Sequence, residues 1–260
     1  KARAMYPVKE EEKTIAGVTV RYFTPPNMPA NKRNRLLINL HGGGFQSDAS
    51  SLLESIPIAS MTQTQVVSVY YRLAPKFVFP APVDDVVAVY KELLKTHQPG
   101  TLAIYGTSAG AILTAQVAVR LKHDKVPLPA ALGFFTGHVD FTASGDSHAF
   151  FGVPGLMGAR IPEAESSRPY MAGHDPKDPL ASPIFADLTG LPPTLCITGT
   201  RDQFLSSTSI FHRALLRAGV DAELVVFEAM SHAHWFMIGI PEATEALETM
   251  AKFFDRNLGK

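Results

Sequence analysis

The sequence predicts an α/β fold in which a mostly parallel central sheet carries helices on both faces. Two observations lead to this prediction. Short apolar runs typical of buried strands alternate with longer stretches of helical periodicity along most of the chain. Glycines stand at the ends of two of these apolar runs, at residues 42–44 after His41 and at Gly106, where the strands of a parallel sheet end and binding sites form.

The charged residues 1–14 are expected to be a solvated entry segment. Strands and helices then alternate along the rest of the chain. Apolar runs bounded by turn residues predict strands at 14–23, 36–40, 66–70, 102–105, 130–135, 194–197 and 223–227. Helical spacing and end signals predict helices at 50–64, 83–94, 111–121, 206–218 and 241–254.

Length and composition predict one α/β domain spanning residues 1–260. The 24 basic and 24 acidic side chains balance, which gives no electrostatic reason to expect nucleic acid or an anionic membrane as a partner. No apolar stretch is as long as a membrane span, so we expect no stable membrane insertion. Cys196 is the single cysteine, which fits a reducing, cytoplasmic location, although a removed signal peptide upstream of Lys1 stays open.

Residues 138–190 break the alternation with many prolines and glycines and predict a lid or cap insertion. The middle of this stretch, about 150–170, is expected to form a small cap over the site. Its apolar side chains either line a pocket or form the core of the cap itself, and they are Phe150, Phe151, Leu156, Met157 and Ile161.

The main motif is the segment 106–110, Gly-Thr-Ser-Ala-Gly, between an apolar strand and a helix. Such a strand, sharp turn and helix form a nucleophile elbow, in which the hydroxyl of Ser108 is lifted above the sheet edge. The flanking glycines lack the Cβ atoms that would obstruct so tight a turn. The helix that follows directs backbone N–H groups toward the group that Ser108 attacks.

A second motif, residues 41–44, His-Gly-Gly-Gly, follows the strand at 36–40. Consecutive glycines allow backbone N–H groups to point at a ligand without obstruction by side chains. A plain glycine turn is the alternative, but with an elbow serine downstream an oxyanion hole is favoured. His41 is expected to brace this loop.

An acid and a histidine follow the serine in the chain order that is typical of enzymes with such an elbow. Asp202 comes after the strand that begins at Thr194, and His232 lies in the loop after the last strand. His232 is favoured as the general base, with His234 as its competitor in the same loop. The two histidines could also suggest a metal site, but no third ligand has suitable spacing, and we expect neither a metal nor a cofactor.

Taken together, these motifs resemble those of the bacterial hormone-sensitive-lipase-like carboxylesterases, which have the α/β-hydrolase fold. The resemblance extends to Tyr-Arg-Leu-Ala-Pro at 71–75, Asp-Pro-Leu-Ala-Ser-Pro at 178–183 and Leu-Pro-Pro at 191–193. It implies a catalytic triad of Ser108, Asp202 and His232. The match of residues 228–232 to the family's approach to its histidine selects His232 over His234.

The resemblance also implies that oxyanion donors are the N–H groups of Gly43, Gly44 and Ala109, with Gly42 as a further candidate. Relatives carry an N-terminal helical cap, which here is either shortened or replaced by a lid from residues 138–190. An open site of this kind favours short acyl groups.

The function expected is therefore that of a serine carboxylesterase, which hydrolyses short- to medium-chain acyl esters through an acyl-enzyme. An amide or lactone hydrolase on the same triad and a non-catalytic receptor for a small ligand are the alternatives. The presence of His232 and His234 argues against the receptor. The expected partner is a small-molecule ester, and the family resemblance suggests a homodimer through the last strand and helix.

Overall fold

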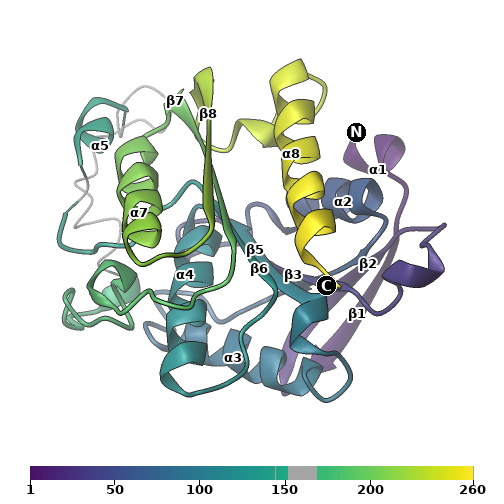
Figure 1. The fold of residues 1–260 in the computed structure, drawn as a ribbon, viewed down its shortest axis with the longest axis horizontal. Coiled ribbons are helices and arrows are strands. Elements are labelled where there is room, and N and C mark those ends of the chain that lie inside the picture. The colour runs from purple at the N-terminus through teal and green to yellow at the C-terminus, as the bar shows by residue number, and fades with distance from the viewer. Residues whose placement is uncertain (144, 152–168, 260) are drawn as a thin grey trace.

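The computed structural model describes residues 1–143, 145–151 and 169–259. Its centre is an eight-stranded sheet with strand order β1-β2-β4-β3-β5-β6-β7-β8 (Figure 1). The strands are β1 (Lys9–Ile15), β2 (Val18–Thr24), β3 (Leu36–Leu40), β4 (Gln65–Val69), β5 (Leu102–Thr107), β6 (Ala131–Phe135), β7 (Thr194–Arg201) and β8 (Ala222–Ser231). The pairs β1/β2 and β2/β4 are antiparallel and the other pairs are parallel, so the mostly parallel sheet is confirmed.

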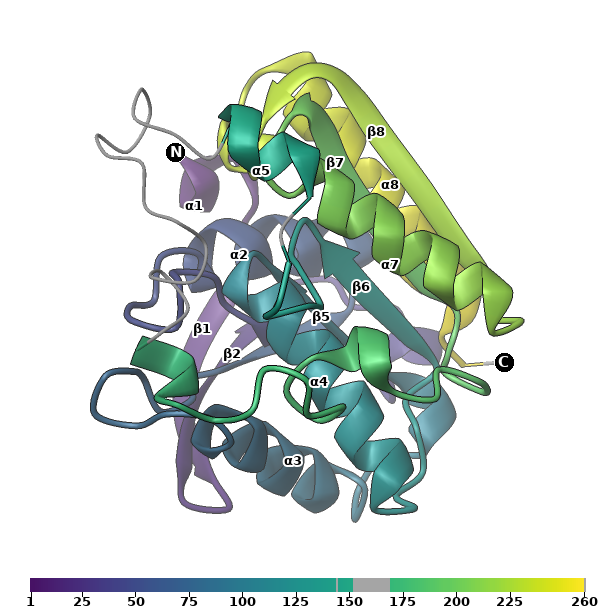
Figure 2. The same cartoon turned by 90° about the vertical axis from the view of Figure 1, so that its left-hand side faces the viewer.

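Helices cover both faces of this sheet (Figure 2). One face is covered by α2 (Ser51–Thr62) and α8 (Pro241–Asn257), and the other by α3 (Ala81–Leu93), α4 (Ala109–His123) and α7 (Leu205–Arg217). Shorter helical elements are α1 (Ala2–Met5), α5 (Asp146–Phe151), η1 (Ala30–Lys32), η2 (Pro99–Thr101), η3 (Pro183–Phe185) and η4 (His234–Phe236). Within the described residues, no helix has the length and apolar character needed to cross a membrane.

The central strands are buried because they are covered on both sides. Every residue of β3 and β5 is buried, which explains why these strands appear in the sequence as continuous apolar runs. Alternate residues along them enter two separate cores. Leu36, for example, packs in the core beneath α3, α4 and α7, whereas Leu37 packs in the core beneath α2 and α8.

The segment 1–14 is largely exposed, as expected, but it also contains a strand that was not predicted. Lys9–Ile15 forms the edge strand β1, which pairs with β2 through a turn at Ala16 and Gly17. Its acidic side chains face solvent and pair across the hairpin, as in the 3.2 Å contact between Glu12 Oε2 and Arg21 Nη2. Charge on an exposed edge strand is common in native sheets, and here it concealed the strand signal.

The expected cap lies partly outside the described residues. Leu156, Met157 and Ile161 belong to the part of the chain that the structure does not describe. The side chains of Phe150 and Phe151 in α5 are 81% and 45% exposed and therefore do not belong to a buried core. Residues 169–190 instead pack on the main body, since Tyr170 and Ala181 join the core beneath α3 and α4.

Candidate active site

Ser108 lies at a strained turn between β5 and α4. Its backbone has φ +60° and ψ −121°, outside the regions that non-glycine residues usually adopt, and its N–H donates to the carbonyl oxygens of Phe135 and Thr136. A Cβ at Gly106 or at Gly110 would overlap the carbonyl oxygen of Leu40. The two glycines are therefore required for this turn to pack against β3.

The glycine loop lies directly beside this turn. A Cβ at Gly42 would be 2.8 Å from the carbonyl oxygen of Thr107 and 3.3 Å from the Cβ of Ser108. Gly43 and Gly44 have φ of +125° and +61°, conformations that favour glycine. The structure therefore brings the two glycine motifs of the sequence together at the carboxyl ends of β3 and β5.

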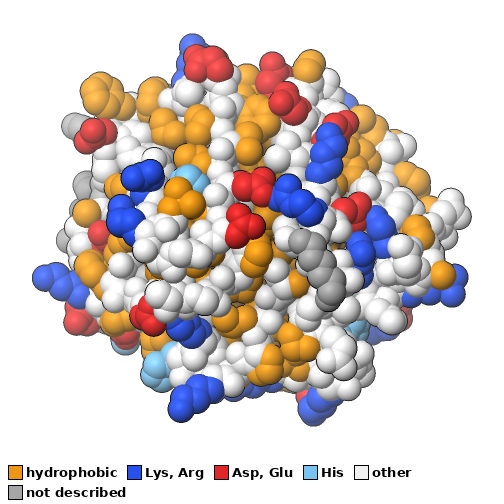
Figure 3. Space-filling model, in the orientation of Figure 1, with side chains coloured by type: hydrophobic (Ala, Val, Ile, Leu, Met, Phe, Trp, Pro, Cys, Tyr) orange, Lys and Arg blue, Asp and Glu red, His pale blue; other side chains and the backbone are white. Residues whose placement is uncertain are grey.

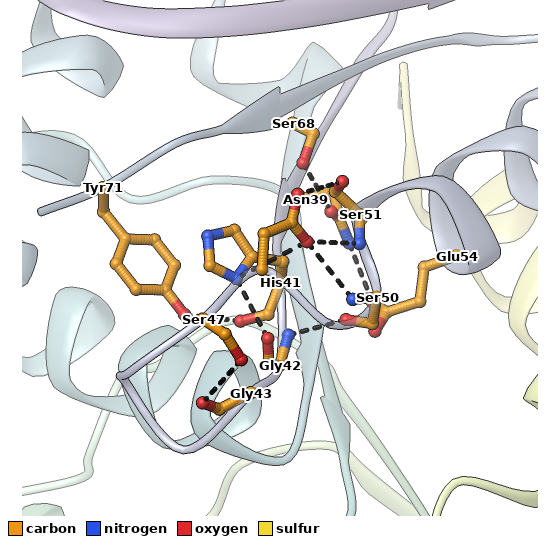
Figure 4. Close-up of polar contacts among 11 residues, drawn as sticks. Asn39, His41, Gly42, Gly43, Ser47, Ser50, Ser51, Glu54, Ser68 and Tyr71 are labelled. Carbon is orange, nitrogen blue, oxygen red and sulfur yellow. Dashed lines mark hydrogen bonds and ion pairs between the residues drawn. The ribbon is translucent and has the colours of Figure 1, made fainter. Parts of the chain in front are cut away.

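The backbone N–H groups of the two motifs differ in whether they donate a hydrogen bond within the protein. The Gly42 N–H donates to Ser50 Oγ at 2.6 Å, so it is not available to a substrate in this conformation (Figure 4). In the described part of the chain, the N–H groups of Gly43, Gly44 and Ala109 donate to no protein acceptor. These three are the groups that remain free to bind an oxyanion.

His41 is buried and anchors the start of the glycine loop. Its ring stacks on that of Tyr71 with centroids 4.2 Å apart, and its Nδ1 lies 3.0 Å from the carbonyl oxygen of Gly42. The Tyr71 hydroxyl donates to the carbonyl oxygen of His41 at 2.5 Å. Burial lowers the pKa of His41, so the ring braces the loop as a neutral group.

Asp202 and His232 lie together. His232 Nδ1 is 3.1 Å from Asp202 Oδ1, and the other carboxylate oxygen accepts a 2.5 Å hydrogen bond from Thr136 Oγ1. Asp202 is fully buried, which acts to raise its pKa. The interaction with His232 and the hydrogen bonds from Thr136 and the Phe204 N–H outweigh burial and hold the pKa of Asp202 below its usual value. Asp202 is therefore a carboxylate that orients His232.

His234 occupies a different environment. Its ring is buried beside Phe227 and Trp235, with ring centroids 4.7 and 5.1 Å away. Burial lowers the pKa of His234, as expected for a neutral imidazole in a core. Asp202 therefore bonds to His232, whereas His234 packs in the interior. The described residues contain no group of three or more His, Cys, Asp or Glu side chains arranged to hold a metal ion.

Two residues near His232 had not been expected from the sequence. Thr136 follows β6 and fixes Asp202, and the ring of Phe204 meets the ring of His232 edge-on with centroids 5.3 Å apart. Neither belongs to one of the sequence motifs. Only the position of Phe204, two residues after Asp202, offered a signal for it.

A family model described as the alpha/beta hydrolase fold matches residues 37–236, which is more than half of the chain. The chain belongs to the alpha/beta hydrolase family. The α/β-hydrolase fold that the sequence predicted is thereby confirmed.

Known relatives of this hydrolase are esterases. An acetyl-hydrolase of Streptomyces hygroscopicus is 32% identical over 236 residues, which cover 89% of this chain and 79% of that protein. The crystal structure of one esterase matches with a TM-score of 0.89 at 35% identity, covering 98% of this chain and 80% of the other. An esterase from the bacterial hormone-sensitive lipase family matches with a TM-score of 0.89 at 31% identity, covering 97% and 85% of the two chains.

These similarities confirm the predicted resemblance to hormone-sensitive-lipase-like carboxylesterases. This hydrolase is a serine carboxylesterase, which is one of the carboxylic ester hydrolases. The prediction of an enzyme is therefore confirmed, and the alternative of a non-catalytic receptor is not supported.

Proposed function

We propose that Ser108, Asp202 and His232 are the catalytic triad of this esterase. The observation that carries the proposal is the position of Ser108 at a strained elbow against the glycine loop, together with the bonded carboxylate and histidine that follow β7 and β8 of the same sheet. His232 bonds to Asp202 through Nδ1, which leaves Nε2 to accept the proton of the Ser108 hydroxyl.

The reaction then proceeds through an acyl-enzyme. Ser108 Oγ attacks the ester carbonyl carbon while its proton passes to His232, and the carbonyl oxygen becomes an oxyanion. The N–H groups of Gly43, Gly44 and Ala109 stabilise that oxyanion, and the N-terminus of α4 adds its partial positive charge. His232 returns the proton to the departing alcohol, and a water molecule then releases the acid by the same steps in reverse. Gly42 supports the loop through Ser50 instead of donating to the oxyanion.

The triad is tested by the labelling of Ser108. A fluorophosphonate is expected to modify the protein once per chain, and Ser108→Ala is expected to remove both the labelling and the hydrolysis of p-nitrophenyl butyrate. Activity that persists in Ser108→Ala would contradict the proposal.

We propose short- to medium-chain acyl esters as the substrates. The support comes from the acetyl-hydrolase among the relatives, whose name denotes a short acyl group. The test is the rate of hydrolysis of p-nitrophenyl acetate, butyrate, octanoate and palmitate. We expect kcat/KM to be highest for acetate or butyrate, and a maximum at palmitate would overturn this assignment.

We also propose a homodimer through β8 and α8. The support is the place of β8 at the edge of the sheet, where Val226 is 41% exposed. Light scattering after size exclusion tests the dimer, with Val226→Lys as the variant expected to be monomeric.

We propose a cytoplasmic location, which is supported by the single buried cysteine Cys196 and is tested by cell fractionation. On the face seen in Figure 3, acidic and basic side chains are interspersed, which supports the view that nucleic acid is not a partner.

A further inference from the structure

A buried carboxyl group lies beneath the glycine loop and takes no part in the proposed triad. It belongs to Glu54 in the first turn of α2, whose residue is 2% exposed (Figure 4). Asn39 Nδ2 donates to Glu54 Oε2 at 2.8 Å, and Ser68 Oγ donates to Asn39 Oδ1 at 2.8 Å. This polar group is therefore held from the side of β3 and β4.

The hydroxyl groups of Ser50 and Thr107 also lie near the carboxyl, where they act against burial and lower the pKa of Glu54. Ser50 Oγ accepts the Gly42 N–H at 2.6 Å, and Thr107 Oγ1 accepts the Trp235 Nε1–H at 3.2 Å. Ser50 thus joins the carboxyl to the glycine loop. Thr107, the residue before Ser108, joins it to the elbow.

The surroundings of Glu54 favour the neutral acid. Burial raises the pKa of Glu54 to about 8, and the nearby carboxylate of Asp48 acts in the same direction. Among the described residues, the buried phenols of Tyr71 and Tyr105 also interact with Glu54. In the described residues, Glu54 Oε1 makes no hydrogen bond of full geometry.

We propose that Glu54 is a positioning residue that fixes the glycine loop and the elbow relative to each other, from a buried place where it bonds to Asn39 and lies beside Ser50 and Thr107. The inference rests on the proposed role of Gly43, Gly44 and Ala109 as oxyanion donors. A donor displaced from its position loses much of its stabilising effect on the transition state. Ionised Glu54 would also place a negative charge beneath the site where an oxyanion develops.

The experiment compares kcat and KM for p-nitrophenyl butyrate from pH 6 to 9.5, with active sites counted by fluorophosphonate titration. Glu54→Gln keeps the size and an acceptor but cannot ionise, whereas Glu54→Leu removes every polar contact. Ser68→Ala is the matched control, because it loses a hydrogen bond of the same buried network at the end away from the glycine loop.

We expect Glu54→Leu to lower kcat per active site on the order of 10- to 100-fold with KM changed less than about twofold. Glu54→Gln is expected to retain kcat near pH 7 and to lose a decline in kcat that the unchanged protein shows above about pH 8. Ser68→Ala is expected to retain both kcat and the decline.

An unchanged kcat per active site in Glu54→Leu would overturn the inference. Should that variant fail to fold, identical pH profiles of Glu54→Gln and the unchanged protein would overturn it equally. Ser108→Ala, assayed in parallel, separates the two proposals. Hydrolysis by Ser108→Ala refutes the triad itself, whereas an inactive Ser108→Ala beside a fully active Glu54→Leu refutes only the role of Glu54.

Discussion

Thr136 and His232 bind opposite oxygens of one buried carboxylate, that of Asp202. Thr136 Oγ1 donates to Oδ2, and His232 Nδ1 lies 3.1 Å from Oδ1. Thr136, which follows β6, thereby fixes the rotamer of Asp202. Asp202 in turn orients His232, which lies in the loop after β8.

Asp202→Asn is expected to lower kcat about 10³- to 10⁴-fold, because the amide cannot hold the tautomer of His232 that a general base requires. Steady-state kinetics on p-nitrophenyl butyrate measure the loss.

Since the folded protein holds the pKa of Asp202 below 3.8, this carboxylate contributes stability above pH 3.8 that is lost as pH falls through the lower folded value. Urea unfolding between pH 3 and 6 should therefore show a weaker acid dependence in Asp202→Asn.

The two histidines of one loop are expected to respond differently to substitution. His232→Ala removes the proposed general base and should abolish hydrolysis while changing the melting temperature little. His234→Ala removes a buried ring between Phe227 and Trp235 and should cost about 2–4 kcal/mol of stability, with kcat per titrated site retained. Thermal melts and active-site titration on both variants decide the matter. A reversed result would assign the base to His234.

Gly110→Ala is expected to prevent folding or to cost more than about 4 kcal/mol, because the new Cβ would overlap the backbone of Leu40. Gly219→Ala is the control. It has φ +75° and nothing within 4 Å of the added Cβ, so only backbone strain of about 1 kcal/mol applies. Soluble yield and chemical unfolding measure both. Equal stability of the two variants would contradict the close approach of β3 to the elbow.

Tyr71→Phe keeps the stacking on His41 and removes only the hydrogen bond to the His41 carbonyl oxygen. A loss of about 1–2 kcal/mol in stability and a several-fold fall in kcat are expected, since this bond fixes the start of the glycine loop. Tyr90→Phe loses a similar bond, from its hydroxyl to the Pro127 carbonyl oxygen at 2.9 Å, at a distance from the site. It should share the loss of stability but keep kcat.

Glu54→Gln is expected to change how stability depends on pH. The pKa of Glu54 is raised by burial to about 8 in the folded protein, against 4.5 for an exposed glutamate, so its contribution to stability is complete below pH 4.5 and is lost as pH rises through 8. The fall has an upper bound of about 5 kcal/mol. Denaturant unfolding at pH 5, 6.5 and 8 should therefore show Glu54→Gln losing less stability with rising pH than the unchanged protein does. Parallel curves for the two proteins would count against a buried neutral acid.

The predictions from sequence succeeded where backbone chemistry is local. The strand at 36–40 has the bounds that the structure gives to β3, and the elbow at Ser108 could be recognised because a buried strand, two glycines and a helix adjoin in sequence. The order of strands could not be read in this way. In particular, β1 carried the signal of a charged surface segment, because its charged side chains face solvent while its backbone pairs with β2.

Contacts between residues distant in sequence were also beyond prediction. The sequence motifs include Ser108, Asp202 and His232, but not Thr136, which is 66 positions from the carboxylate that it binds. Glu54 appeared as one charged residue of a helix, and only its burial beneath the glycine loop, together with the contacts to Asn39 and Ser50, distinguishes it. Such groups owe their chemistry to burial, which depends on the whole fold.

The pairing of Leu40 with Gly106 in adjacent strands has a consequence for how this enzyme can diversify. The proposed oxyanion donors follow the carboxyl end of β3, and the proposed nucleophile follows the carboxyl end of β5. The backbone hydrogen bonds between these two strands therefore set the spacing between the groups. Mutations outside these strand ends and the proposed triad can change the surroundings of an ester without shifting that spacing. New substrates can therefore be acquired while the reaction chemistry stays constant.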